Sequence, residues 1–174
     1  MLVEAFTDGA CSGNPGIGGW GVLLRFGEVT KTIAGGHPHA TNNQMEMMGA
    51  IVALESLKSP CTVVLTTDSQ YVQKGITQWM KGWKLKGWMD PSHSKAVANI
   101  DLWLRMEKAA ARHKVEWLWV RGHDGHAENE IADKLAVSGK KLVLEHGPLA
   151  RLINGNLEFV QNVAANQALA RECV

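Results

Sequence analysis

The chain of 174 residues is 45% apolar and has a formal net charge of +1, which favours one globular domain that buries its own core. Its three cysteines show no paired spacing, which argues against a disulfide framework and favours a reducing, cytoplasmic setting. With no signal-peptide pattern and no run of about 20 apolar residues, we expect no helical membrane span. The small net charge of the whole chain attracts nucleic acid only weakly, so nucleic-acid binding would require a local basic patch.

The first third of the chain is rich in β formers. Alternating apolar residues predict strands over 2–7, 19–27 and 29–35. The Gly-, Asn- and Pro-rich stretch 11–21 predicts a turn, so the first strand would end at Asp8. Three such strands in succession would form an antiparallel meander.

Helices and strands alternate after the meander. Thr41 and Gln44 have the spacing of a capping box, which predicts a helix that runs to about Lys58 and stops before Pro60. A polar helix start is expected at Asp68. The other predicted elements are a strand over 62–67, a helix over 99–112, a strand over 114–120, a Gly-rich loop over 121–126 and a helix over 127–142.

This order of elements predicts an α/β protein with a mixed sheet and helices on its faces. In such sheets, functional sites form at the carboxyl ends of parallel strands. Asp8 and Asp68 each follow a predicted strand, so both are candidates for such a site.

Glu46 is the most informative single acid. Its helical neighbours three, four and seven positions along are Gly49, Ala50 and Ala53, a stripe of small residues that lets a helix approach another element closely. A glutamate on that stripe would face inward, where a buried acid needs a partner or a metal ion. A solvent-facing glutamate that favours the helix dipole fits the same periodicity equally well.

Three aspartates complete the candidate acids, and each has a simpler interpretation. Asp8 before glycine is typical of a turn, Asp68 of a helix N-cap, and Asp133 of an exposed helical acid. Together with Glu46, however, acids on four elements could converge on one point. Carboxylates held together raise one another's pKa, and Mg²⁺ or Mn²⁺ cancels that repulsion. Two such ions can assist phosphodiester cleavage.

The segment 74–95 combines positive charge with aromatic rings. Five lysines and one aspartate leave it a local charge of +4. Basic groups beside aromatics suit a surface that follows a nucleic-acid strand, but a solvated basic helix with core tryptophans is the alternative. The residues concerned are Lys74, Lys81, Lys84, Lys86, Lys95, Asp90, Trp79, Trp83 and Trp88.

Six stretches resemble, in the same order, the motifs of bacterial ribonuclease H of type 1. They are TDGACSGNPGIGGWG (7–21), TNNQMEMMGAIVALE (41–55), TDSQYV (67–72), GWKLKGW (82–88), NIDLW (99–103) and VRGHDGHAENEIADKLA (120–136). The resemblance covers about residues 1–142. It implies a ribonuclease H fold over residues 1–146, with a five-stranded mixed sheet in the order βββαβαβα and helices on both faces.

The resemblance also implies an activity and a cofactor. The expected enzyme is a monomeric endonuclease that cuts the RNA strand of RNA–DNA hybrids and leaves 5′-phosphate and 3′-hydroxyl ends. It would use one or two Mg²⁺ ions per site, with Mn²⁺ as a possible substitute. The family's catalytic and metal-binding acids fall on Asp8, Glu46, Asp68 and Asp133.

The family's loop histidine falls on His123. A histidine there suits proton transfer or product release, and the sequence does not distinguish the two. His123, His126 and Glu128 also permit a zinc site, although cysteine partners and the His-Glu-x-x-His pattern are absent.

Similarity to the family also assigns substrate contacts. Contacts to the RNA 2′-hydroxyls fall on Cys11, Asn14, Asn42, Asn43 and Gln70; contacts to a DNA phosphate fall on Thr41 and Asn99; the grip on the DNA strand falls on Trp79, Trp83, Lys84, Lys86 and Trp88. Turn formation by Asn14 and helix capping by Asn42 and Asn43 are alternative or coexisting roles.

The chain departs from the family pattern at two places. His39 stands where the family has a phosphate-binding arginine, so we expect a weaker grip that declines as the pH rises through neutrality. Residues 147–174 extend beyond the shared pattern after a boundary at Gly147-Pro148, and 157–171 are expected to be helical or disordered.

Three other functions compete with this interpretation. A same-fold DNA nuclease, such as a transposase, would share the acids without needing the asparagines or the Lys–Trp segment. A non-catalytic hybrid-binding module would be favoured if an acid were missing, but all four are present. A purely structural domain leaves the co-occurring motifs unexplained.

Overall fold

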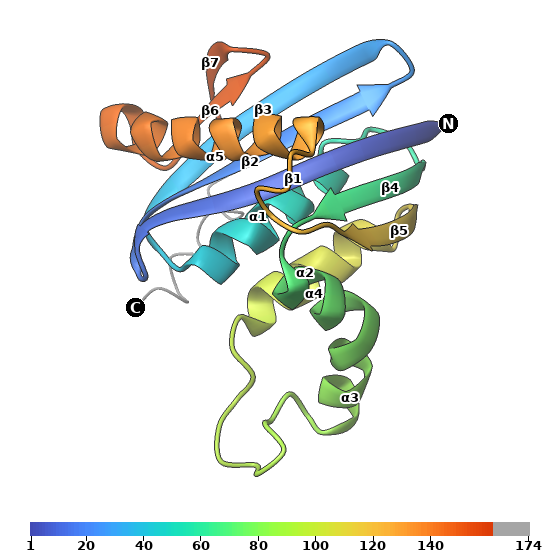
Figure 1. The fold of residues 1–174 in the computed structure, drawn as a ribbon. Helices are drawn as coiled ribbons and strands as arrows, with labels where there is room; N and C mark the ends of the chain where they lie inside the picture. The colour runs from blue at the N-terminus through green and yellow to red at the C-terminus, as the bar shows by residue number, and fades with distance from the viewer. Residues whose placement is uncertain (162–174) are drawn as a thin grey trace.

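The computed structural model describes residues 1–161 and places a mixed sheet between helical layers (Figure 1). A meander opens the sheet, because β1 (Leu2–Gly13), β2 (Gly16–Phe26) and β3 (Val29–Ala40) pair antiparallel. Next to β1 lie two parallel strands, β4 (Thr62–Thr67) and β5 (Lys114–Trp119). The predicted mixed α/β sheet is confirmed.

The sheet has seven strands rather than the five expected, in the order β5-β4-β1-β2-β3-β6-β7. The two extra strands are β6 (Ala150–Ile153) and β7 (Asn156–Phe159), a hairpin that pairs antiparallel with the edge of β3. The expected helix over 157–171 is therefore wrong for 157–159, and 162–171 lie outside the described residues. Residues 154 and 155 form the tight turn, both with positive φ, so an Asn-Gly pair indicated this hairpin.

The first three strands are longer than predicted. The stretch 11–21, interpreted as a turn, is strand except at Asn14 and Pro15, where the chain reverses between the paired residues Gly13 and Gly16. Glycine weakens a strand, but here β1 and β2 pair with each other through this stretch, and β2 also pairs with β3. As a result β1 continues past Asp8, which lies within the strand rather than at its end.

Two helices cover one face of the sheet (Figure 1). They are α1 (Asn42–Glu55) and α4 (Ile100–Ala110), and the main core lies between them and the sheet. The predicted capping box at the start of α1 is present, since Thr41 accepts from the Gln44 N–H and the Gln44 side chain accepts from the Thr41 N–H. The helix ends at Glu55, slightly earlier than predicted.

Short helical turns project from this layer below α4 (Figure 1). They are α2 (Gln70–Lys74), a π-helical segment (Gly75–Trp79) and α3 (Met80–Leu85). Together with the loop that follows α3, they form the basic segment 74–95. No helix among the described residues is long and apolar enough to cross a membrane.

The opposite face is covered by α5 (Ala127–His146), which packs through glycines (Figure 1). A Cβ added at Gly19 of β2 would lie 2.0 Å from the carbonyl oxygen of Ala136, and one added at Gly139 would lie 2.0 Å from that of Gly35. The helix backbone therefore touches the strands directly, which explains the glycines of β2 and β3.

Two helical glycines should respond to alanine in opposite ways. Gly139→Ala should lower the free energy of unfolding by about 2–3 kcal/mol, because the methyl has no space without a backbone shift. Gly82→Ala in α3 should raise it by up to about 1 kcal/mol through helix propensity, since nothing lies within 4 Å of the new methyl. Urea unfolding followed by circular dichroism measures both. An unchanged midpoint for Gly139→Ala would contradict the close packing.

Candidate metal centre and nucleic-acid interface

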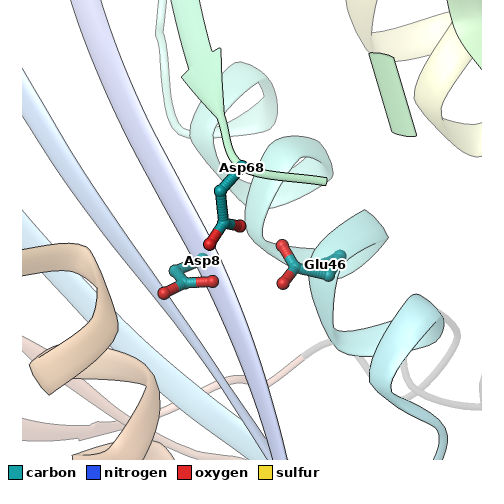
Figure 2. Close-up of side chains that lie close together, drawn as sticks. All are labelled: Asp8, Glu46 and Asp68. Carbon is teal, nitrogen blue, oxygen red and sulfur yellow. The ribbon is translucent and has the colours of Figure 1, made fainter. Parts of the chain in front are cut away.

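Three carboxylates from separate elements converge at one end of the sheet. Asp8 comes from β1, Glu46 from the first turns of α1, and Asp68 from the residue after β4, and their side chains point toward one another (Figure 2). Each offers an oxygen that lies within 4.8 Å of the others. The sequence prediction that these three acids converge is therefore met by the geometry.

Small residues let α1 approach β1 closely enough to bring Glu46 to Asp8. A Cβ at Gly9 would lie 2.4 Å from the backbone nitrogen of Glu46, and one at Gly49 would lie 3.2 Å from the carbonyl oxygen of Asp8. Glu46 is only 5% exposed. The inward orientation is thus confirmed, and the solvent-facing alternative is wrong.

The end of β4 opens space for the cluster. The last β1–β4 pair is Thr7 with Thr67, so Asp8 has a strand partner on the β2 side only. Asp68 begins the turn beyond β4, and its carbonyl oxygen accepts a hydrogen bond from the Trp119 indole at 2.9 Å. Trp119 is a positioning residue that sequence reasoning missed; its signal was an aromatic residue at the end of a strand parallel to β4.

The N-cap interpretation of Asp68 is wrong. Ser69 caps α2, because its hydroxyl oxygen accepts from the Val72 N–H at 3.1 Å. The carboxylate of Asp68 is thus left to face the other two acids.

Burial and mutual repulsion raise the proton affinity of the cluster. Burial and the charge of Asp68 raise the pKa of Asp8 from its ordinary 3.8 to about 7, against hydrogen bonds from Glu46 and the Gly9 N–H. Burial, followed by the charges of Asp8 and Asp68, holds the pKa of Glu46 well above its usual range. Ionisation of Asp8 and of Glu46 is therefore costly in this cluster.

This arrangement suits a hard divalent cation. One carboxylate oxygen of Glu46, Oε2, is buried and has no hydrogen-bond partner among the described residues. Buried polar atoms are rarely left unpaired, and an oxygen-only donor set with high negative charge is the type that binds Mg²⁺ or Mn²⁺. The residues present therefore fit a divalent metal ion.

Asp133 lies close to the cluster without joining its tightest group. It is half-buried in α5, and its charge contributes to the raised pKa of Asp8. Side chains two residues apart point to the same face of a strand, so Asp8 shares a face of β1 with Phe6. Phe6 packs against Ala132 of α5. The fourth acid thus approaches from the α5 side, whereas Glu46 approaches from α1.

The loop with His123 adjoins the cluster. A Cβ at Gly122 would lie 2.7 Å from the carboxylate oxygen Oδ2 of Asp68, so this part of the loop touches the site. His123 is exposed and has a positive φ of 58°. His126 caps α5 by accepting from the Asn129 N–H, and no His-containing metal group occurs within residues 1–161. The zinc alternative therefore has no support there.

The asparagines assigned to substrate contact lie together at the start of α1. Asn14, in the β1–β2 turn, accepts a hydrogen bond from the Asn42 N–H at 3.0 Å, and the Asn14, Asn42 and Asn43 side chains are exposed. Nearby, the Cys11 thiol donates to the carbonyl oxygen of Ala40 at 2.9 Å. The turn and capping roles of these residues coexist with an exposed polar surface.

Thr41 and Asn99 are joined by a polar network. The Gln44 amide, which belongs to the capping box with Thr41, donates to the Asn99 side chain at 3.2 Å. Asn99 donates in turn to the Tyr71 hydroxyl at 3.0 Å. His39 is exposed just before Thr41, and its N–H donates to His37 Nδ1. The remaining assigned residue, Gln70, accepts from the Lys74 ammonium.

Ring contacts link the tryptophans of segment 74–95 to Trp103 in the core. We call this connected set of rings, Trp79, Trp83, Trp88 and Trp103, the Trp ladder. Trp103 of α4 is fully buried; its ring lies 5.3 Å from that of Trp83, which lies 5.9 Å from Trp79 and 6.1 Å from Trp88. Trp79 is 39% exposed. Trp83 and Trp88 are partly buried and pack against the core, whereas Trp79 is exposed.

Part of the positive charge of segment 74–95 is neutralised by an ion pair. Lys84 forms an ion pair with Glu107 of α4, whereas Lys86 is exposed. Asp90 accepts hydrogen bonds from Ser92, Ser94 and the Lys95 N–H, which hold its pKa at about 2. Asp90 thus organises the loop after α3.

Comparison with solved structures first defines the class of fold. This chain superposes on LC9-RNase H1, described as a type 1 RNase H with the type 2 active-site motif, with a TM-score of 0.74 and 34% identity, over 96% of this chain and 84% of that one. LC11-RNase H1, solved in complex with an RNA/DNA hybrid, gives a TM-score of 0.59 at 19% identity, over 82% of this chain and 99% of that one. The fold is of the ribonuclease H-like class.

Sequence comparison then shows the family. The RNase H family model matches residues 2–141. Ribonuclease H of Halorhodospira halophila is 63% identical over 79% of this chain and 92% of its own length, and ribonuclease HI of Vibrio cholerae is 58% identical over 77% and 85%. The chain belongs to the ribonuclease H family and is an enzyme that cleaves the RNA strand of RNA–DNA hybrids.

Removing one acid should stabilise the metal-free protein. The pKa of Asp8 is about 7 when folded and 3.8 ordinarily, so the folded state binds this proton more tightly. The favourable contribution of that proton is complete below pH 3.8 and is lost as the pH rises through 7. Asp8→Asn should therefore raise the free energy of unfolding at pH 8 in EDTA, by on the order of 2 kcal/mol.

Thermal unfolding at pH 8 and pH 5 measures this effect. The increase in the free energy of unfolding that Asp8→Asn produces should be smaller at pH 5, where Asp8 is already protonated in the folded wild type. Asp124→Asn, which removes an exposed acid from the neighbouring loop, should change stability by less than about 0.5 kcal/mol at either pH. A destabilised Asp8→Asn protein at pH 8 would show that other contacts of Asp8 outweigh its repulsion by the neighbouring acids.

Proposed function

We propose that this ribonuclease H cuts RNA by a two-metal mechanism with Mg²⁺ at Asp8, Glu46, Asp68 and Asp133, and leaves 5′-phosphate and 3′-hydroxyl ends. The observation that carries the proposal is the convergence of three carboxylates, of which Asp8 and Glu46 are buried and have raised pKa values, together with the unpaired Glu46 Oε2. Mn²⁺ would substitute, because it accepts the same oxygen ligands.

The chain's own residues divide the work. Asp8, Glu46 and Asp68 would hold the metal ions, and Asp133 would complete the ligand set from the α5 side. Metal ions bound there would activate a water and stabilise the leaving oxygen of the phosphodiester. Trp119 keeps Asp68 in place through its indole hydrogen bond, and the Gly9–Glu46 contact fixes α1 against β1.

His123 would act at the edge of this centre. Its loop touches Asp68 through Gly122, and its exposed position lets it reach a substrate phosphate or the departing product. Either proton transfer or assistance of product release is compatible with a histidine in this place.

Recognition of the hybrid would use two surfaces. Exposed asparagines at the β1–β2 turn and the start of α1 suit contacts to 2′-hydroxyls across the shallow minor groove. The Trp ladder and Lys86 of segment 74–95 suit the DNA strand. The complex of LC11-RNase H1 with an RNA/DNA hybrid supports hybrid binding by this fold. All these groups come from one chain, which favours a monomer, and the unpaired cysteines favour the cytoplasm.

Matched duplexes test the proposal. In Mg²⁺, RNA–DNA should be cut in its RNA strand to 5′-phosphate ends, while DNA–DNA and RNA–RNA of the same sequence survive. Glu46→Gln should reduce cleavage by at least about a thousandfold and leave hybrid binding measurable. Glu116→Gln, the same change at an exposed site on β5, should cut like wild type. Equal cutting of DNA–DNA, or an active Glu46→Gln enzyme, would overturn the proposal.

His39 provides a second prediction about the substrate. His39→Arg should bind the hybrid more tightly, because arginine adds a fixed positive charge with paired donors. Fluorescence anisotropy with a labelled hybrid in Ca²⁺ measures the affinity, and His146→Arg on α5, which adds the same side chain at another exposed histidine, should bind like wild type. Equal hybrid affinity for His39→Arg and wild type would remove His39 from the interface.

A further inference from the structure

A second polar site lies at the far end of α1, away from the carboxylates. It is a cavity of about 300 Å³ between β3, β6 and the ends of α1 and α4. Its polar lining residues are Lys31, Glu55, Ser56, Arg105 and Arg151, and apolar side chains including Val52 and Ile153 line the rest. The β6–β7 hairpin, which lies beyond the stretch that matches the family model, forms one of its walls.

The Arg151 side chain reaches this cavity across Gly35, a position on the sheet that has no side chain. It pairs with Gly35 of β3, which in turn pairs with Trp20 of β2. A Cβ at Gly35 would lie 2.3 Å from the Trp20 ring. Because Gly35 has no side chain, the Arg151 guanidinium lies over that ring, 5.2 Å from its centroid. The cross-strand neighbours Trp20, Gly35 and Arg151 thus place the Arg151 guanidinium at the cavity and fix its position.

The guanidinium of Arg151 makes no hydrogen bond or ion pair with any other residue of 1–161 that the structure records. Burial lowers the pKa of Arg151, the charge of Arg105 adds to the effect, and the charge of Glu55 opposes it. Guanidinium groups have five N–H donors and no acceptor. Within the described residues, this half-buried arginine therefore has no directly paired anion of the kind that normally accompanies a buried charge.

Glu55, the one acid among the described lining residues, is already paired with another arginine. Glu55 accepts from Arg105 through both carboxylate oxygens at 2.8 Å, the two-pronged pairing that satisfies a carboxylate best. Lys31 and Arg151 then remain beside this pair, so the lining residues have a net charge of +2. The Ser56 hydroxyl donates to the Ala53 carbonyl oxygen, which leaves its oxygen as an acceptor.

We propose that this cavity binds a small organic anion, a phosphate monoester with a compact apolar body, held by Arg151 and Lys31. A dianionic phosphate group matches the net charge of the lining, and the guanidinium fork matches its oxygens. The cavity is larger than a phosphate group alone requires, and its apolar walls suit the body of the ligand. The bound anion would tie β6 to the α1–α4 layer and stabilise the folded chain.

Phenyl phosphate is a suitable probe, with inorganic phosphate and benzyl alcohol as partial ligands. In ¹⁵N-labelled wild type, phenyl phosphate should shift the amide signals of Ile33, Ser56 and Ile153 in a saturable way. Inorganic phosphate should bind at least tenfold more weakly, and benzyl alcohol should leave these signals unchanged. Binding at the nucleic-acid interface is followed separately by the amides of Asn42 and Asn43.

Three variants decide the outcome. Arg151→Gln and Lys31→Gln should each weaken phenyl phosphate binding at the cavity by at least tenfold, and Lys31→Gln does not disturb the contact with Trp20. Lys108→Gln removes an exposed positive charge from the same helix as Arg105 without lining the cavity, and should bind like wild type. The proposal would be overturned if phenyl phosphate shifted none of these amide signals in wild type. It would also be overturned if both cavity variants bound phenyl phosphate as tightly as wild type.

Discussion

The repulsion among Asp8, Glu46 and Asp68 is the constraint around which the rest of the structure is arranged. Three carboxylate oxygens lie within 4.8 Å of one another in a mostly buried setting, where charges interact far more strongly than in water. Such a cluster survives only if the backbone that carries it is held rigidly from several sides. Strands β1 and β4, α1 and the loop before α5 provide that support, and the concentrated negative charge is compatible with a divalent cation.

Close backbone contact is the means by which the chain provides rigidity. Gly9 and Gly49 bring α1 against β1 on one face of the sheet, and Gly19 and Gly139 bring α5 against β2 on the other. Each contact lets backbones approach without intervening side chains, so the position of Glu46 relative to Asp8 is set by main-chain atoms rather than by flexible side chains. The glycines that look like turn residues in the sequence are therefore packing residues, and the site depends on them.

Local signals in the sequence predict most of the fold, because they act within a few residues. The capping box at Thr41, the small-residue stripe after Glu46 and the β-rich run before Asp68 all predict their elements correctly. The errors arise where pairing between strands overrides local propensity. Strands β1 and β2 extend through a glycine-rich stretch because each supplies the other with hydrogen bonds, and the β6–β7 hairpin forms because β3 offers it an open edge.

The candidate site shows the same division between local and distant causes. The small-residue stripe marks Glu46 as a candidate but fits an inward and a solvent-facing side chain equally well, so the contact of α1 with β1 decides its burial. The placement of Asp133 and Trp119 likewise depends on how α5 and β5 dock against β1 and β4. Family resemblance supplied Asp133 and His123, and their roles remain proposals. Trp119 was missed because a hydrogen bond from an indole to a backbone carbonyl across two strands leaves no periodic trace in the sequence.

The Trp ladder explains how the projecting segment 74–95 is held against the rest of the protein, through Trp103 of α4 and Tyr71 of α2. Gly75 lies directly against Trp103, where an added Cβ would meet the ring at 2.0 Å, and the π-helical turn there leads into α3. Rings from Trp103 outward contact one another in sequence, so burial at the base extends order to the partly exposed Trp79. Exposed lysines can then stand on a fixed aromatic platform, and in the proposed binding of the DNA strand such a platform would reduce the conformational entropy lost.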